Sequence, residues 1–119
     1  MALLGLTSQR RLKSRPQFDQ VFDHKCTSRD KFFVVYARPN NEQVSRLGLV
    51  VSRRVSARAV DRNRIKRQIR EDFRLSTNEL EVLDYVVVAR AAALKETGTA
   101  IRASLQQHWK RINKQCGNS

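Results

Sequence analysis

The chain has 119 residues and carries 24 Lys and Arg against 11 Asp and Glu, a formal net charge of +13. This length predicts one compact domain, and a hydrophobic share of 40% with only 4 Gly and 2 Pro excludes collagenous and wholly disordered classes. So large an excess of positive charge opposes a compact fold through self-repulsion. It therefore favours a polyanionic partner.

The positive charge is concentrated in one part of the chain. Residues 46–74 hold ten basic and three acidic residues, a local balance of +7 (10 minus 3), which is just over half of the total. A focus of this kind is typical of a binding surface rather than of a solubility feature spread over the molecule.

The termini and the cysteines predict a cytoplasmic protein. The apolar start, residues 1–6, is too short for a signal-peptide core, and no run approaches the roughly 20 apolar residues of a membrane span. Cys26 and Cys116 lie far apart with no framework, as expected of reduced cytosolic thiols. A zinc site would need these cysteines to meet His24 and His108 at spacings that are unusual for zinc, so no bound metal is expected.

The first predicted element is a short helix that ends near Asp23. Ser14 can cap it, and Gln17 three residues later completes a capping box. Phe18, Val21 and Phe22 then form one apolar stripe at helical spacing.

Strand signals dominate the next part of the chain. Residues 31–38 and 46–52 are rich in β-branched and aromatic residues, and the turn residues 39–42 between them favour a hairpin. Residues 25–29 are compatible with a further short strand. Residues 84–91 form an almost continuous apolar run, which is typical of a strand buried on both faces.

Two longer helices are predicted in the second half. Residues 60–75 place Ile65, Ile69 and Phe73 four residues apart on a face that points to the core. A final helix begins near Thr97 or Thr99, with Gly117 as a possible C-cap. Its expected inner stripe is Ile101, Leu105, His108, Trp109 and Ile112.

The predicted order, α-β-β-β-α-β-α, indicates an α+β fold, a single-domain α/β sandwich in which helices cover one sheet. The strand–helix–strand passage over residues 46–91 allows a parallel crossover. We expect the domain to span residues 10–114, between a flexible N-terminal extension over 1–9 and a tail over 115–119.

The helix over residues 60–75 carries a row of cations. Arg62, Lys66 and Arg70 are four residues apart, so they line up on one face, and Arg64, Arg67 and Arg74 flank that row. Repulsion between like charges in such a row destabilises an isolated helix, and bound phosphates would remove that repulsion. Arg is well suited to this role because its guanidinium binds phosphate through two hydrogen bonds. A plain solvated face mixed with acids is the alternative, but at the far end of the helix the only acids nearby are Glu71 and Asp72.

At this helix the sequence resembles the protein component of bacterial ribonuclease P. Arg62-Asn63-Arg64-Ile65-Lys66-Arg67 followed by Arg70 looks like the family's arginine-asparagine-arginine motif. The similarity keeps the family order through further blocks and covers roughly residues 10–113. Those blocks are residues 11–13, 18–22, 33–36, 46–52 and 84–90.

The resemblance implies an unusual left-handed βαβ crossover, where general handedness rules predict a right-handed one. It also implies a protein that binds a catalytic RNA and assists removal of the 5′ leader of precursor tRNA. The catalytic RNA would be contacted by Arg53, Arg54, Arg62, Asn63, Arg64, Lys66, Arg67 and Arg70. The leader would lie in a cleft lined by Phe18, Phe22 and Tyr36.

The sequence predicts no active site in the protein itself. Its acids are scattered, Asp19 and Asp23 are typical of a solvated helical pair, and His24 and His108 have no recognisable partners. By the resemblance, catalysis belongs to the RNA and its bound Mg²⁺, and no obligate protein partner is expected. The alternative hypothesis is a general or ribosomal RNA-binding protein with no role in tRNA processing.

Overall fold

The structure is a computed structural model and describes residues 8–116. It contains three helices and four strands, with short 3₁₀ turns at Ser8–Arg10, Thr77–Glu79 and Ala91–Ala93. In chain order the main elements are α1 (Arg15–Asp23), β1 (Cys26–Arg29), β2 (Phe33–Pro39), β3 (Arg46–Val50), α2 (Ala59–Ser76), β4 (Leu83–Ala89) and α3 (Gly98–Cys116).

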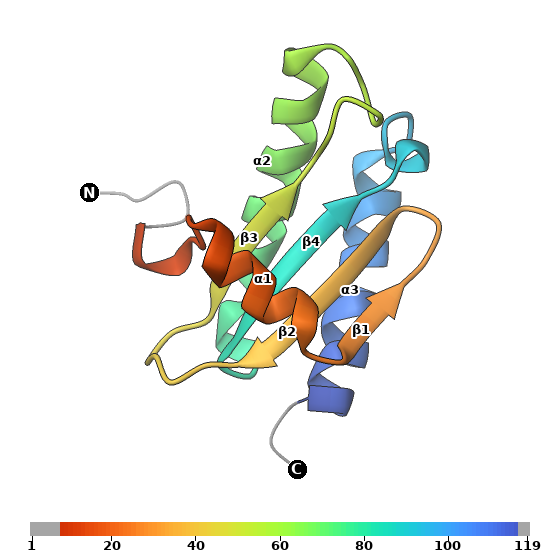
Figure 1. The fold of residues 1–119 in the computed structure, drawn as a ribbon. Helices are drawn as coiled ribbons and strands as arrows, with labels where there is room; N and C mark the ends of the chain where they lie inside the picture. Colours follow the sequence, from red (N-terminus) through yellow and green to blue (C-terminus); the bar gives the residue numbers. More distant parts are fainter. Residues whose placement is uncertain (1–7, 117–119) are drawn as a thin grey trace, which may run out of the picture.

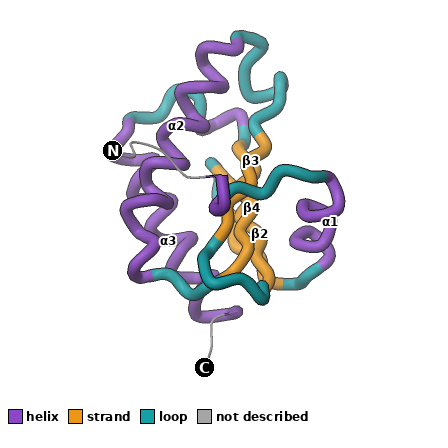
Figure 2. The backbone as a smooth tube through the Cα atoms, turned by 90° about the vertical axis from the view of Figure 1, so that its left-hand side faces the viewer, coloured by secondary structure: helices purple, strands orange, loops and turns teal. Residues whose placement is uncertain are grey.

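The predicted α/β sandwich is confirmed. One sheet has the strand order β1-β2-β4-β3, in which β3 and β4 run parallel and the other neighbours run antiparallel. Helix α1 crosses one face of this sheet, and α2 and α3 cover the other (Figures 1 and 2). The predicted parallel passage from β3 through α2 to β4 is therefore present, while its left hand stays a prediction.

The predicted hairpin between the second and third strands is wrong. β2 and β3 do not pair, because β4 lies between them. Tyr85, Val86 and Val87 of β4 are fully buried, so this strand is covered on both faces and takes a central position. The compatible short strand over residues 25–29 is confirmed as β1, which pairs antiparallel with β2.

The start of α1 is set by the predicted capping box. The backbone N–H of Gln17 donates to Ser14 Oγ at 3.3 Å, and the N–H of Ser14 donates back to Gln17 Oε1 at 3.0 Å. Behind this cap, Val21 is fully buried in a small core with Leu12 and Val86. These contacts place α1 across β4 and its neighbours.

The main core lies between the sheet and the other two helices. Ile65, Ile69 and Phe73 of α2 are completely buried, as the spacing predicts. Phe73, Tyr85 and Trp109 meet edge to face, with ring centroids 5.5–5.7 Å apart. The α3 residues of the predicted inner stripe are all buried, whereas Gly117 lies outside the described residues. Since the apolar side of α2 is held in this way, its basic residues must point outward.

Cys26 and Cys116 are joined in a disulfide bond, which corrects the expectation of separate reduced thiols. They are 90 residues apart in sequence, but their Cα atoms are 5.9 Å apart because the end of α3 packs beside β1. Only this tertiary contact brings the two cysteines together.

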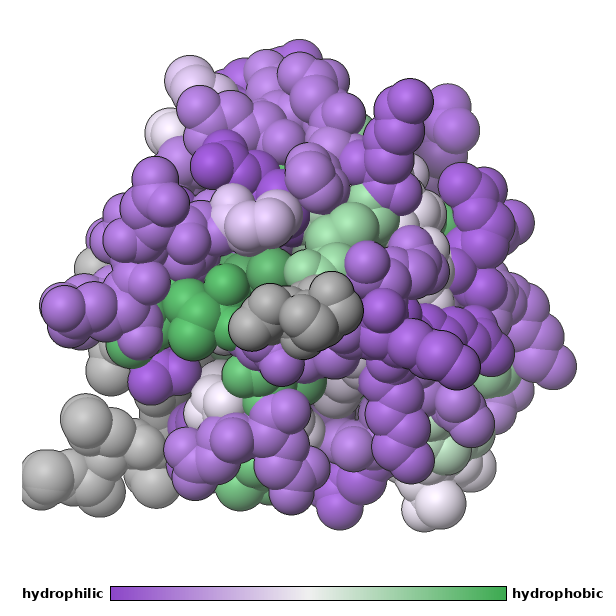
Figure 3. Space-filling view, turned by 90° about the horizontal axis from the view of Figure 1, so that it is seen from below, coloured by the Kyte–Doolittle hydropathy of each residue, from purple (hydrophilic) through white to green (hydrophobic). Residues whose placement is uncertain are grey.

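Most of the surface shown in Figure 3 is hydrophilic, and hydrophobic residues gather there in a limited central area. Within residues 8–116, none of the helices combines the length and apolar character needed to cross a membrane.

Candidate nucleic-acid interface

Three aromatic side chains meet where α1 crosses the sheet. Phe22 of α1 lies edge to face against Tyr36 of β2, with ring centroids 4.9 Å apart, and Phe18 lies 6.5 Å from Phe22. Phe22 is 38% exposed, while Phe18 and Tyr36 are half-buried. The structure thus brings together the three residues predicted to bind the leader, with part of each ring open to solvent.

Phe18 also reaches the edge strand β3. Its ring packs on Gly48, where a Cβ atom would lie only 2.6 Å from Phe18 Cζ. The backbone N–H of Leu12 donates to the carbonyl of Leu47 at 3.0 Å, so the segment before α1 lies along the same strand. Two neighbouring residues of β3 therefore position α1 and the chain that leads into it.

A basic pocket of about 140 Å³ lies between this segment, β3 and α2. Phe18 and Leu49 form part of its wall, and Arg11, Lys66 and Arg70 supply its charge. None of these three cations takes part in the ion pairs found among residues 8–116. Burial, followed by the charges of Arg11 and Arg67, lowers the pKa of Arg70 below its ordinary value. The pocket concentrates uncompensated positive charge, which favours a phosphate.

The opposite flank of α2 faces α3. Arg64 and Arg67 line a groove of about 590 Å³ between the two helices, together with Arg102 of α3. Arg64 Nη2 donates to the carbonyl of Leu94 at 3.0 Å. Two of the three residues predicted to flank the basic row, Arg64 and Arg67, thus lie on a second surface of the helix, which faces α3.

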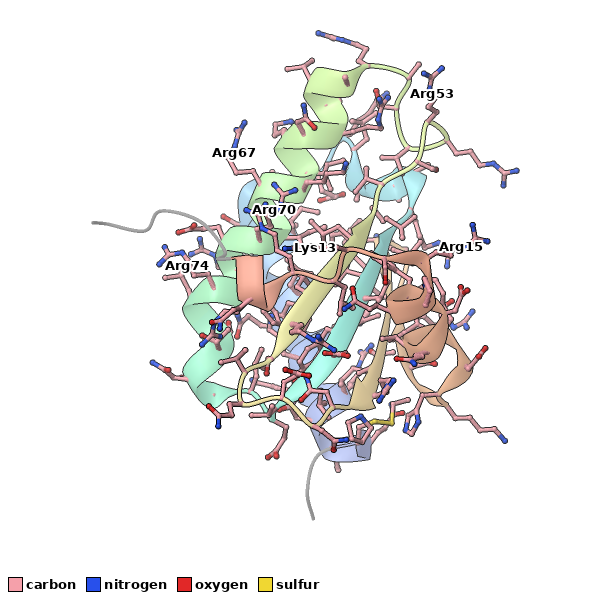
Figure 4. The ribbon with its side chains drawn as sticks, turned by 60° about the vertical axis from the view of Figure 1, so that its left-hand side comes forward. Lys13, Arg15, Arg53, Arg67, Arg70 and Arg74 are labelled. Atoms are coloured by element: carbon pink, nitrogen blue, oxygen red, sulfur yellow. A yellow bond between two sulfur atoms is a disulfide. The ribbon has the colours of Figure 1, made fainter. Side chains whose placement is uncertain are left out.

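The beginning of α2 is tied to the loop before it. Arg62 Nη1 donates to the carbonyls of Ser56 and Ala57 at 2.9 and 3.0 Å, so this guanidinium holds the loop as well as facing outward. Asn63 is exposed, as are Arg53 and Arg54 in the loop after β3. Figure 4 shows Arg53 on that loop and Arg67, Arg70 and Arg74 along α2.

Two acids of α2, Glu71 and Asp72, also line the groove between α2 and α3, and Asp72 Oδ1 lies 3.8 Å from Arg102 Nε. Glu71 pairs with Arg74 at 2.6 Å, and Asp72 is buried, where Trp109 Nε1 donates to it at 2.8 Å. In the part of the chain that the structure describes, no three carboxylates converge. The arrangement offers charge neutralisation and stacking, which are binding chemistries.

The prediction that His108 has no partner is wrong. His108 is completely buried, its Nδ1 lies 2.7 Å from Ser28 Oγ, and its Nε2 lies 3.2 Å from Asp30 Oδ1. The three residues are up to 80 positions apart, so no spacing in the sequence signals the contact. Because the imidazole has no access to solvent, this group supports the packing of α3 on the sheet.

Two residues of the interface were missed by sequence reasoning. The sequence indicates Arg11 as an interface residue only in that it belongs to the basic stretch before α1. No pattern in the sequence indicates Gly48, because its role depends on the ring of Phe18 in α1.

Comparison with known proteins decides the family. The chain matches the Ribonuclease P family over residues 6–113. The Ribonuclease P protein component of Methylococcus capsulatus is 42% identical over 115 residues, which covers 97% of this chain and 90% of the relative. The chain belongs to the ribonuclease P protein family.

Further ribonuclease P proteins support the assignment. The protein component of Chromobacterium violaceum is 43% identical over 96 residues, covering 81% of this chain and 79% of the relative. The RNase P protein of Staphylococcus aureus has 35% identity and a TM-score of 0.79, covering 88% of this chain and 95% of that structure. The RNase P protein of Thermotoga maritima has 32% identity and a TM-score of 0.77, and the match covers 85% of this chain and 96% of that structure. The family gives this ribonuclease P protein a role in tRNA processing as the protein component of a ribonuclease.

Proposed function

We propose that the chain binds the catalytic RNA of ribonuclease P and holds the 5′ leader of precursor tRNA, which assists removal of the leader to give the mature 5′ end. The observation that carries this proposal is the position of Phe18, which borders both the aromatic cluster and the basic pocket. One continuous surface therefore offers ring faces for bases and cations for phosphates, the combination that single-stranded RNA requires.

The leader lies against Phe18, Phe22 and Tyr36 in this proposal. Base stacking on an aromatic side chain contributes about 1–3 kcal/mol for each base and tolerates different sequences. Lys66 and Arg70 face the same pocket and neutralise phosphates of the catalytic RNA or of the adjoining leader, which also removes the repulsion between Arg70 and Arg11.

The catalytic RNA also contacts the rest of the basic surface. Arg64 and Arg67 point to the α3 side of the helix, while Arg53 and Arg54 extend from the loop before α2. The helix can therefore contact two RNA segments at once. In full, the proposed contacts to the catalytic RNA are Arg53, Arg54, Arg62, Asn63, Arg64, Lys66, Arg67 and Arg70.

The protein contributes positioning and charge in this reaction. Mg²⁺ ions would be held by the RNA, not by residues of this chain, and would supply the chemistry of the cleavage step. The residues of this chain bind the leader, orient the precursor and screen the repulsion between two polyanions. The proposed setting is the cytoplasm.

Reconstitution tests the proposal directly. The chain is added to a bacterial ribonuclease P RNA at low Mg²⁺, and cleavage of precursor tRNA is measured. We expect the cleavage rate to rise with the chain and to stay at background with the chain alone. A general RNA-binding protein would instead bind precursor and mature tRNA with equal affinity.

Tyr36→Ala tests the leader surface within the holoenzyme. Because the variant removes one stacking face, we expect precursor binding to weaken by about 1 kcal/mol, roughly fivefold, with little change for mature tRNA. Tyr36→Phe keeps the ring and serves as the matched control. Equal losses for precursor and mature tRNA would contradict the assignment.

A further inference from the structure

Three side chains with metal-binding atoms meet where the end of α1, the start of β1 and the end of α3 come together. His24 follows α1, Cys26 begins β1, and Cys116 ends α3. One imidazole nitrogen and the two sulfur atoms all lie within 4.8 Å of one another. The cysteines are half-buried and His24 is exposed, so the cluster is open to solvent on one side. Figure 4 shows the disulfide at the end of the molecule remote from Arg53.

The fold holds these residues together by contacts other than the disulfide. The side chain of Gln115 accepts from the backbone N–H of Thr27 at 3.3 Å and donates to its carbonyl at 2.9 Å. These bonds tie the residue before Cys116 to the residue after Cys26. The backbone N–H of His24 donates to the carbonyl of Val21, which fixes the end of α1. Reduction of the disulfide would therefore leave the two sulfur atoms close to each other.

We propose that Cys26, Cys116 and His24 bind one zinc ion when the disulfide is reduced. Two thiolates and one imidazole are the donor atoms that zinc prefers in proteins, and they select it over hard cations such as Mg²⁺. Three protein ligands leave the fourth tetrahedral position for a water molecule. This proposal departs from the sequence-based expectation of no bound metal, because the spacing did not reveal that the end of α1, the start of β1 and the end of α3 lie at one place.

The redox state controls this site. A dithiol reductant transfers two electrons and two protons to the S–S bond, which gives two thiols and leaves the reductant as a disulfide. Zinc then displaces the two thiol protons and binds His24 as neutral imidazole. In the oxidised chain the sulfur atoms are bonded to each other and supply no thiolate.

Both states link α3 to the sheet edge. β1 pairs with β2, and Thr27 stands opposite Tyr36 in that pairing. The disulfide bond in the oxidised chain and the zinc ion in the reduced chain would therefore each join β1, the strand beside the proposed leader surface, to the end of α3.

Zinc content measures the site without reference to RNA. The full chain is reduced with a phosphine under anaerobic conditions, incubated with zinc chloride, desalted and analysed by mass spectrometry. We expect about one zinc for each reduced chain and almost none for the oxidised chain. Cobalt(II) in place of zinc should give the charge-transfer absorption of a thiolate ligand.

His24→Ala is the decisive variant, because its exposed side chain is not part of the core. We expect its zinc affinity to fall at least about tenfold, since even outer-shell changes have that effect, with an unchanged circular dichroism spectrum. Lys25→Ala, between two of the ligands, is the matched control and should bind zinc normally. The proposal is overturned if His24→Ala binds as tightly as Lys25→Ala, or if Cys26→Ser binds as much zinc as the reduced parent. Either result would leave the RNA-binding proposal untouched, because no RNA enters the measurement.

Discussion

Gly48 determines how closely α1 approaches the sheet. No residue from 8 to 116 has a positive φ, so glycine is not needed there for its backbone conformation. It is needed for space, because a Cβ atom at Gly48 would overlap the ring of Phe18 and lie 3.3 Å from Leu12 Cβ. The position of the ring therefore depends on the absence of a side chain in β3.

Gly48→Ala should move Phe18 and weaken leader binding. The atoms in conflict belong to the far end of the Phe18 side chain, so the ring can shift, and we expect a cost of about 1 kcal/mol in the free energy of unfolding. Urea unfolding measures this cost, and binding of precursor against mature tRNA measures the effect on the leader. Adding Phe18→Leu to Gly48→Ala should recover the stability but not the leader preference. Recovery of both would show that the ring contributes only packing.

The buried group around His108 makes stability depend on pH. Burial lowers the pKa of His108, and the nearby carboxylate of Asp30 offsets this only in part. For Asp30, burial alone would raise the pKa, but hydrogen bonds from Ser104 and from the N–H groups of Phe33 and Phe32 outweigh it and lower the pKa to about 2. Both groups bind protons less readily in the folded chain than in the unfolded one.

The free energy of unfolding should therefore decrease in acid. The contribution of His108 is complete above pH 6.5, its ordinary pKa, and is lost as the pH falls below that value. The contribution of Asp30 is lost later, as the pH falls from 3.8 toward 2. Urea unfolding at pH 7.5 and 5.5 should give the lower midpoint at pH 5.5, and His108→Gln should reduce the difference. His24→Gln is the exposed control, and an unchanged difference in His108→Gln would contradict the assignment.

At the scale of the element, α2 combines one apolar face with two cationic flanks. The buried stripe of Ile65, Ile69 and Phe73 was predictable because its spacing is a property of the helix itself. The division of the cations was only partly predictable. Lys66 and Arg70 face α1, and Arg67 faces α3, because neighbouring elements decide which space each side chain enters.

Removing Lys66 and Arg70 should weaken assembly of the holoenzyme and flatten its salt dependence. Each lost phosphate contact should reduce the slope of log K against log salt by about 0.7–0.9. The double variant Lys66→Ala, Arg70→Ala is compared with Lys110→Ala, Lys114→Ala, which removes the same charge from α3. Equal slopes for the two double variants would show that net charge, not the basic pocket, controls binding.

At the scale of the molecule, two hydrophobic clusters, one on each side of the sheet, stabilise a chain with a net charge of +13. The core overcomes a repulsion that remains wherever cations converge without acids, as in the pocket of Arg11, Lys66 and Arg70. An anion that binds only the folded chain stabilises it by RT ln(1 + c/Kd), where c is the anion concentration, so the gain grows with that concentration.

Sulfate or phosphate should therefore raise the melting temperature beyond chloride at matched ionic strength. At an anion concentration ten times the dissociation constant, we expect a gain of about 1.4 kcal/mol, or several degrees for a domain of this size. The Lys66→Ala, Arg70→Ala variant should gain less, and calorimetry measures both. Equal melting temperatures in sulfate and chloride would show that the repulsion is too weak to matter.

The helices and strands and most of their buried faces could be predicted from the sequence. The cap formed by Ser14 and Gln17, the apolar stripes of α2 and α3 and the buried strand β4 depend on interactions between residues a few positions apart, which a single chain displays. The tertiary structure alone decided that β4 separates β2 from β3, that Cys26 meets Cys116, and that His108 lies against Ser28. These contacts join residues 38 to 90 positions apart. They form because packing three helices on one sheet buries the most apolar surface, and that gain belongs to the assembled layers rather than to any one segment.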